Sequence, residues 1–255
     1  RSRMTVIIER DKFVDVVGRP ADCDVVQLKV DGNYAYVEVR NNVLRHFSRS
    51  GRLVNEYSVH QRDMTVLGEY VFGTERAKHG KLIYGSVVVF DLLDFNGRDF
   101  RNEPYRIRST YAFAASRALD AAGLNFATIM SYGPIDVNRL WAKKVATGEY
   151  EGLVYRRSSD TFPATVWREK AEFDTILTAD SFTKSTSKTY KGIVTSINGR
   201  NADGVVTLVG GGLDDEEKWE LTRSPDRYLG RQFETTHNGA FRSGKLRHPR
   251  FKRWL

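Results

Sequence analysis

Short runs of β-branched and aromatic residues, separated by turn-forming pairs, dominate the first hundred positions of the chain. Between residues 25 and 47, the pairs Asp31-Gly32 and Asn41-Asn42 divide the apolar runs, which is typical of a strand–turn–strand arrangement. Further strands are expected at 65–72 and 82–93. The second of these is apolar almost throughout, which predicts a central strand covered on both faces.

Helical periodicity is confined to two segments in the middle of the chain. The first covers residues 107–122 and ends at Gly123, since glycine favours the position just after a helix. The second begins at Asp136, a residue type that caps helix N-termini, and it stops near Gly148. Its apolar residues fall on one face, which predicts packing against a sheet or another helix.

The composition changes late in the chain. The stretch 180–189 is polar and rich in Ser, Thr and Lys, which is typical of a linker. An acidic helical turn at 214–221 interrupts short strands that are rich in glycine. Strands are expected at 151–156, 164–170, 192–197, 204–209, 229–236 and 240–253.

These elements predict an α+β fold with two parts. About 65 residues of short strands after the linker fit a five-stranded barrel of the OB type. The preceding part contains antiparallel sheets with flanking helices. The expected domains are 1–182, a linker at 183–189, and the barrel at 190–255.

Composition narrows the class of protein. The chain has 255 residues, of which 40% are hydrophobic and 28% charged, as in an ordinary globular protein. No apolar run approaches the roughly 20 residues that span a bilayer, and the N-terminus has no secretory pattern, so we expect a cytoplasmic protein that does not contact membranes. The single cysteine, Cys23, excludes an internal disulfide and a four-cysteine zinc site, and the five histidines are scattered along the chain.

Positive charge is concentrated at the C-terminal end. The chain carries a formal net charge of +8, and its isoelectric point is about 9.5. Between Arg242 and Leu255 there are six Lys and Arg residues and no acid. Such a stretch attracts nucleic-acid phosphates. A solvated basic tail is the alternative that charge alone leaves open.

Lys29 is the candidate nucleophile. It lies in Lys29-Val30-Asp31-Gly32, at the end of an expected strand. Alone this pattern is weak, because a lysine before a turn is usually a solvated surface residue. Further charged and aromatic residues follow it in this order: Arg49 in Ser48-Arg49-Ser50-Gly51, Glu69 after Gly68, Phe90 before Asp91, Glu151 before Gly152, and Arg168 and Lys170 after Trp167.

One reaction needs all these residue types. A lysine attacks the α-phosphate of ATP only as a neutral amine, and desolvation or nearby cations lower its pKa towards neutrality. Arg49, Arg168 and Lys170 are candidate cations, and the last two share a face of their strand. Glu69 and Glu151 offer hard oxygen ligands for Mg²⁺ or Mn²⁺. Phe90 offers a face for stacking on a purine, unless it is plain core.

This order of motifs resembles that of the covalent nucleotidyltransferases, which comprise ATP-dependent DNA ligases, RNA ligases and mRNA capping enzymes. The likeness covers most of residues 25–172. At the C-terminus, Val209-Gly210-Gly211-Gly212-Leu213 and the stretch from Gly244 to Phe251 resemble the OB domain of small phage-type and bacterial DNA ligases. Two departures are evident: Tyr34 stands where the family often has arginine, and the family's Arg-x-Asp-Lys motif is not seen after Phe251.

The resemblance implies a monomeric ATP-dependent DNA ligase that seals nicked duplex DNA in repair, replication and recombination, in the cytoplasm of a bacterium or a phage-infected host. Lys29 would carry AMP, Glu69 and Glu151 would bind the metal or the ribose, Phe90 would stack on adenine, and Arg49 would contact the ribose or the nick phosphate. Other implied contacts are Gln27, Leu28, Arg168 and Lys170 to the nucleotide, and Lys245, Arg247, His248, Arg250, Lys252 and Arg253 to DNA.

Three alternatives stay open to different degrees. An RNA ligase or capping-type guanylyltransferase shares the same chemistry, although the segment Leu246 to Phe251 favours DNA. A catalytically weak nucleic-acid-binding relative is compatible with the missing terminal motif. An NAD-dependent ligase is disfavoured, because that class needs a cysteine zinc module and this chain has one cysteine.

Overall fold

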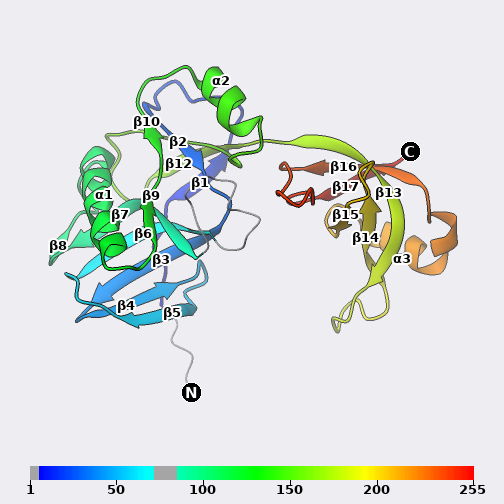
Figure 1. Ribbon diagram of the computed structural model, residues 1–255, viewed down its shortest axis with the longest axis horizontal. Coiled ribbons are helices and arrows are strands. Elements are labelled where there is room, and N and C mark those ends of the chain that lie inside the picture. Colours follow the sequence, from blue (N-terminus) through cyan, green and yellow to red (C-terminus); the bar gives the residue numbers. More distant parts are fainter. Residues whose placement is uncertain (1–5, 72–84) are drawn as a thin grey trace. The chain divides into compact units, whose positions relative to one another are not determined.

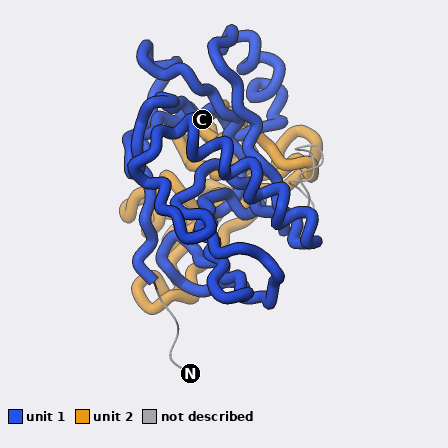
Figure 2. Tube along the Cα trace, turned by 90° about the vertical axis from the view of Figure 1, so that its left-hand side faces the viewer, with its two compact units in different colours: residues 1–170 blue, residues 171–255 orange. Residues whose placement is uncertain are grey.

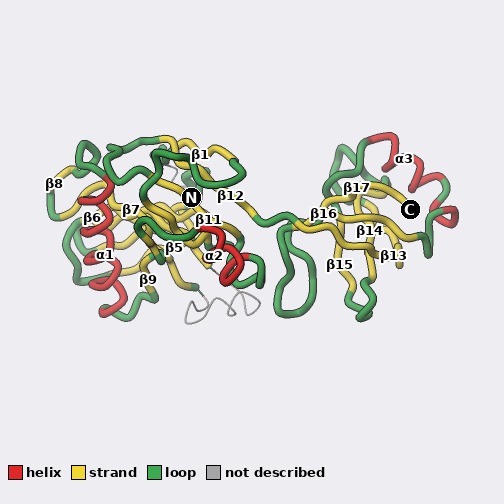
Figure 3. The backbone as a smooth tube through the Cα atoms, turned by 90° about the horizontal axis from the view of Figure 1, so that it is seen from above, coloured by secondary structure: helices red, strands yellow, loops and turns green. Residues whose placement is uncertain are grey.

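The computed structural model describes residues 6–71 and 85–255, and the chain divides into two compact units, residues 1–170 and 171–255 (Figure 2). Strands predominate in both units and helices are few (Figure 3). None of the helices in the described ranges has the length and apolar character that a bilayer crossing requires.

Two β-sheets and one long helix make up unit 1 (Figure 1). The first sheet has the order β1-β12-β11-β2-β10, namely β1 (Lys12–Asp15), β12 (Thr165–Lys170), β11 (Gly152–Arg156), β2 (Val25–Lys29) and β10 (Ser131–Tyr132). The second sheet has the order β5-β4-β3-β6-β7-β8, with β9 paired to β7. Its members are β5 (Leu53–Ser58), β4 (Val43–Phe47), β3 (Asn33–Arg40), β6 (Met64–Val71), β7 (Ser86–Phe95), β8 (Arg98–Asp99) and β9 (Phe126–Thr128).

Helix α1 (Tyr105–Ala121) covers one face of the second sheet (Figure 1). Its small residues Ala112 and Ala115, both fully buried, allow the helix to approach a layer of valines on β3, β6 and β7. The chain then leaves the helix at Gly123, whose φ of +82° is available to glycine at little cost. This packing fixes the position of β7, which carries part of the site described below.

The helix expected from Asp136 is present but short. Asp136 accepts a hydrogen bond from the backbone N–H of Arg139, as an N-cap residue does. The α-helical part, α2 (Val137–Leu140), is followed by one wider helical turn, Trp141–Val145.

Unit 2 contains one five-stranded antiparallel sheet in the order β15-β14-β13-β16-β17. Its strands are β13 (Phe173–Lys184), β14 (Val194–Arg200), β15 (Val206–Val209), β16 (Gln232–His237) and β17 (Arg250–Trp254). Helix α3 (Asp215–Arg223) begins with a capping box between Asp214 and Glu217, and the short helical turn Pro225–Arg227 follows it.

Most sequence-based elements are confirmed. The expected strand–turn–strand segment contains β2, β3 and β4, and Asn41 and Asn42 form the second turn with φ of 50° and 62°. Strand β6 occupies 64–71, one residue earlier than expected. Strand β7 is buried as predicted for a central strand, although it begins at Ser86 and positions 72 and 82–84 lie outside the described residues.

Three expectations differ from the structure. The polar stretch 180–189 begins inside β13, because its Ser and Thr residues face solvent while alternate positions such as Ala179 pack on the core. A strand was expected at 240–253, but in this part of the described chain regular strand begins only at Arg250, with β17 (Arg250–Trp254). The five-stranded sheet is also open, whereas a closed barrel was expected: β15 and β17 are its edges, and a single bridge joins Gly211 to Arg250. Strand β15 has only four residues and is followed by three glycines, so it cannot form a continuous series of hydrogen bonds with β17.

The division between units falls after Lys170, whereas the sequence pattern placed it at a linker over 183–189. Residues 171–189 belong to unit 2 because β13 pairs with β14 on one side and with β16 on the other. The assignment of distinct functions to the two parts stays a prediction.

Candidate active site of unit 1

Lys29 lies where the chain crosses from one sheet of unit 1 to the other. It is the last residue of β2, and Asn33 begins β3 in the second sheet. The intervening turn must therefore fit tightly against β6. A Cβ at Gly32 would lie 2.5 Å from the carbonyl oxygen of Tyr70 and 2.8 Å from Cγ of Glu69, so only glycine allows this approach.

Strand register places the cationic side chains beside Lys29. Gly152 on β11 lies opposite both Lys29 on β2 and Lys170 on β12. Opposite residues in a sheet present their side chains on the same face. A Cβ at Gly152 would lie 2.0 Å from the carbonyl oxygen of Glu169, which explains why glycine occupies this crowded position.

The next row of the same sheet contains Gln27, Val154 and Arg168, which lie opposite one another. Because residues i and i+2 of a strand share a face, Gln27 lies on the face of Lys29, and Arg168 on that of Lys170. Arg168 donates to Asp15 of β1 at 2.6 Å. Leu28 points to the opposite face and is fully buried in the core.

Glu151 is the closest partner of Lys29. Its Oε2 lies 2.7 Å from the Lys29 Nζ, and its Oε1 lies 3.6 Å from the Lys170 Nζ. The Glu151 side chain is only 4% exposed, whereas Lys29 is 16% and Lys170 33% exposed. One buried carboxylate therefore holds both lysines.

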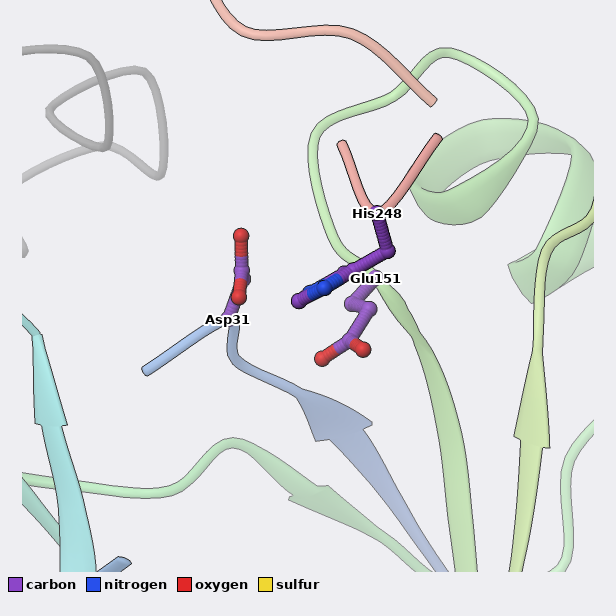
Figure 4. Close-up of side chains that lie close together, drawn as sticks. All are labelled: Asp31, Glu151 and His248. Atoms are coloured by element: carbon purple, nitrogen blue, oxygen red, sulfur yellow. The ribbon is translucent and has the colours of Figure 1, made fainter. Parts of the chain in front are cut away.

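Two further carboxylates complete the cluster around Lys29. Asp31 is 3% exposed, and one of its oxygens lies within 4.8 Å of a Glu151 oxygen. Figure 4 shows Asp31 and Glu151 with their side chains directed into the same region. Glu69 on β6 accepts a hydrogen bond from the backbone of Gly32 and interacts with Lys29. Asp31 and Glu151 are buried and Glu69 is half-buried, and carboxylate oxygens of this kind suit a divalent cation such as Mg²⁺.

The charge state of Lys29 differs from the sequence-based expectation. Burial lowers the pKa of Lys29, but the carboxylates of Glu151, Glu69 and Asp31 together outweigh burial, so its pKa is raised. Sequence reasoning expected a ring of cations that keeps the amine neutral. The structure instead surrounds the amine with acids, which stabilise the ammonium form.

The ionisation of the Glu69 carboxyl group is strongly perturbed. Burial raises its pKa to about 7, since the attraction of Lys29 only partly offsets the loss of solvation and the repulsion by Glu151. The ionised form of Glu69 is therefore costly in the folded chain at neutral pH.

This cost predicts a stabilising substitution. The folded chain retains a proton on Glu69 from pH 4.5 to about 7, where the unfolded chain has lost it, so Glu69 lowers stability as pH rises through that interval. Glu69→Gln should raise the free energy of unfolding by roughly 3 kcal/mol at pH 8 and by little at pH 4.5. Urea unfolding with EDTA at both pH values measures the difference. An equal effect at the two pH values would contradict the assignment.

Phe90 is placed by a β-bulge. Leu67 of β6 pairs with Asp91 and Gly68 pairs with Val89, so Phe90 has no partner on β6. A bulge redirects the side chain of its extra residue. The half-buried Phe90 ring lies 6.2 Å from the ring of Tyr34 and 5.3 Å from the guanidinium of Arg156.

A buried network behind Phe90 was missed by sequence reasoning. Arg156 forms an ion pair with Asp11 at 3.0 Å and donates to Gln27 at 2.9 Å. Tyr105 accepts from Gln27 and donates to the carbonyl of Phe90. An arginine directly after an apolar strand was the available signal, but its partners lie far apart in sequence.

Arg49 lies in the exposed turn between β4 and β5. Asp91, the residue after Phe90, is fully buried and pairs with Arg108 of α1 at 2.9 Å. That aspartate therefore anchors the helix to the sheet and does not face the lysine cluster.

The basic residues of unit 2 that were expected to bind DNA differ in their ion pairs and in their exposure. Three of them pair with acids of unit 2: Arg250 with Glu172, Lys252 with Asp174 and Glu234, and Arg253 with Glu234. Arg247 is buried and donates to the carbonyl of Ala240, while Lys245 and His248 are exposed. The fold thus neutralises part of a stretch that carries no acid of its own.

Comparison with known proteins places this arrangement among solved structures. No protein-family model and no curated protein matches the chain. A structure of a Lig E DNA ligase is similar at a TM-score of 0.64 and 18% identity, over 98% of this chain and 100% of that one. The structure named Pmar-Lig_PreS3 has a TM-score of 0.60 and 17% identity over 97% and 68% of the two chains. A mycobacterial DNA ligase D complexed with ATP and MES has a TM-score of 0.50 and 17% identity over 96% and 95%. The chain therefore has a fold that is also found in DNA ligases.

Proposed function

We propose that this chain is an ATP-dependent DNA ligase that seals 5′-phosphate/3′-hydroxyl nicks in duplex DNA through a lysyl-AMP intermediate on Lys29. The observation that carries the proposal is the cluster in which Lys29 Nζ lies 2.7 Å from Glu151, beside Asp31 and Glu69. A half-buried lysine beside three carboxylates and a second lysine is unsuited to a surface role. The likeness to a Lig E DNA ligase over the whole of both chains supports the reaction class.

In the first step, the Lys29 nitrogen bonds to the α-phosphorus of ATP while the bond to pyrophosphate breaks. Lys29 must lose a proton beforehand, and Glu151 lies within hydrogen-bonding distance to accept it. Lys170 and Arg168, on the same face of the sheet, would neutralise the α-phosphate. Arg49 would bind the ribose or the nick phosphate.

Asp31, Glu69 and Glu151 would hold a divalent cation, which would stabilise the negative charge that develops on the phosphates. Phe90, redirected by the bulge, would stack on the adenine. These roles extend the expectation for Glu69 and Glu151 by one residue, Asp31, which the sequence motif contains but which had no assigned role.

The later steps take place on DNA. AMP passes from Lys29 to the 5′-phosphate of the nick, and the 3′-hydroxyl then displaces AMP to form the phosphodiester. Unit 1 would be the adenylation domain, and unit 2, which we propose to be the OB-type domain, would contact the duplex backbone through exposed basic residues such as Lys245. We propose a monomer that acts in the cytoplasm.

Mass spectrometry of the intact chain tests this proposal. After incubation with ATP and Mg²⁺, the chain should gain the mass of one AMP, which peptide mapping should locate on Lys29. The same preparation should seal nicked DNA in preference to nicked RNA and should use ATP in preference to GTP. An adduct with GTP would indicate a capping-type enzyme instead, and DNA binding without any adduct would indicate a catalytically inactive relative.

A further inference from the structure

A cavity of about 530 Å³ lies beside Phe90 in unit 1, within the size range of small-ligand sites. It is lined by Val25, Phe90, Tyr105, Ser109, Ser131 and Ser158, among others. Val25 is four residues before Lys29 on the same face of β2, which places it about 13 Å along the strand from the lysine. That separation suits a nucleotide whose phosphate is at Lys29 and whose base enters the cavity.

The buried amide of Gln27 lies behind two residues of the cavity wall, Tyr105 and Ser131, and its orientation is fixed by its partners. Arg156 donates through Nε to Gln27 Oε1 at 2.9 Å, and a guanidinium has no acceptor, so the oxygen must face the arginine. The amide nitrogen therefore faces Tyr105 at 2.6 Å and Ser131 at 3.0 Å.

The arginine is itself held in place. Its side chain is 5% exposed, and it pairs with Asp11, which is 1% exposed, at 3.0 Å. Asp11 also accepts from the backbone N–H of Ala164 at 2.8 Å. Because both members of the pair are buried and hydrogen-bonded, reversal of the Gln27 amide would place its N–H₂ group against the guanidinium, which is strongly unfavourable.

The fixed orientation of the Gln27 amide also fixes the direction of its hydrogen bonds to Tyr105 and Ser131, which line the cavity. Tyr105 donates to the carbonyl oxygen of Phe90 at 2.7 Å, so its own proton is committed. Ser131 lies directly opposite Gln27 on β10 and accepts the second amide proton at 3.0 Å. Within residues 6–71 and 85–255, Ser131 donates to no other group, and it lines the cavity. Its hydroxyl proton is thus available to an acceptor in the cavity.

We propose that Ser131 donates a hydrogen bond to the N1 nitrogen of adenine, and that Asp11, Arg156 and Gln27 are positioning residues that fix this polarity. The inference rests on the proposed function. Residues in the Gln27 row lie farther along β2 from Lys29, towards the edge of the base opposite the phosphates. In adenine that edge presents N1 as an acceptor, whereas guanine presents an N–H there, which a donor hydroxyl rejects.

Formation of the protein–AMP adduct from ATP and from 1-deaza-ATP tests the proposal. The chain should use ATP about tenfold better in kcat/KM, which is the effect of one hydrogen bond. Ser131→Ala should use the two nucleotides equally. Gln27→Glu keeps the side-chain shape but accepts the Ser131 proton, and it should also lose the preference. Ser109→Ala is the matched control, because the Ser109 hydroxyl lines the cavity but donates to its own helix at Arg106.

An unchanged preference for ATP over 1-deaza-ATP in Ser131→Ala would overturn the inference while leaving the ligase proposal intact. The same holds if the wild-type chain uses ATP and 1-deaza-ATP equally. Absence of any adduct from ATP in the wild-type chain would instead overturn the proposed function itself.

Discussion

Replacement of Lys29 by alanine will abolish the protein–AMP adduct, a loss of at least about a thousandfold as expected for removal of a covalent nucleophile. The reason is chemical: within the cluster, Lys29 supplies the nitrogen that bonds to phosphorus, and Lys170, which lies 3.6 Å from the other Glu151 oxygen, is more exposed. Radiolabelled ATP followed by denaturing electrophoresis measures the adduct.

Sealing of a nick that already carries 5′-AMP separates the nucleophile role from a structural one. That step does not use the Lys29 nitrogen, so Lys29→Ala should retain it to within about tenfold. Because alanine removes the cation nearest to the carboxylates, Lys29→Arg provides a second variant that keeps the charge and also forms no adduct. Lys143→Ala, at an exposed lysine of the same unit, is the control and should behave as wild type. An adduct on either Lys29 variant would refute the assignment.

Glu151→Gln will lower both stability and activity. Glu151 is 4% exposed and holds Lys29 at 2.7 Å, so its neutralisation removes the nearest partner of a buried ammonium. Loss of one member of a buried pair typically costs about 3–5 kcal/mol. With the nearest carboxylate gone, burial should prevail and the pKa of Lys29 should fall. Adduct formation should drop at least about a hundredfold, because a proton acceptor and a metal ligand are lost together.

A neighbouring ion pair provides the control for Glu151→Gln. Glu149 accepts from Lys144 at 2.8 Å, nearly the same distance, but both side chains are more exposed. Glu149→Gln should therefore cost at most about 1 kcal/mol and leave adduct formation unchanged. Equal destabilisation by the two substitutions, measured by urea unfolding at pH 7, would show that Glu151 is an ordinary surface acid. Glu69→Gln and Glu151→Gln, in one cluster, should thus change stability in opposite directions.

Local patterns predicted the elements of unit 1 because each signal there is short-range. The turn at Asn41-Asn42, the cap at Asp136 and the glycine after α1 are all decided by a few consecutive residues. Strand alternation also placed Arg168 and Lys170 on one face, which the register with Val154 and Gly152 bears out.

The remaining features depend on contacts between distant residues. The pKa of Lys29 depends on how many carboxylates the two sheets bring close to its amine, and no short stretch of sequence determines how many these are. The bulge at Phe90 is a register shift between strands, and the path from Asp11 through Arg156 to Gln27 joins residues more than 100 positions apart. The polar stretch 180–189, which begins inside β13, was predicted to be a linker because the strands that pair with β13 come later in the sequence.

The pairing of basic residues on β17 with Glu172 and with acids on β13 and β16 has a consequence for how unit 2 would bind a polyanion. A phosphate that approaches Arg250 or Lys252 competes with a carboxylate already in contact with that side chain. Fewer phosphates are then neutralised than six basic residues would suggest, so fewer counterions leave the nucleic acid and the logarithmic salt dependence of association should be shallow. Such a surface would hold duplexes weakly and release them readily, a property suited to repeated turnover.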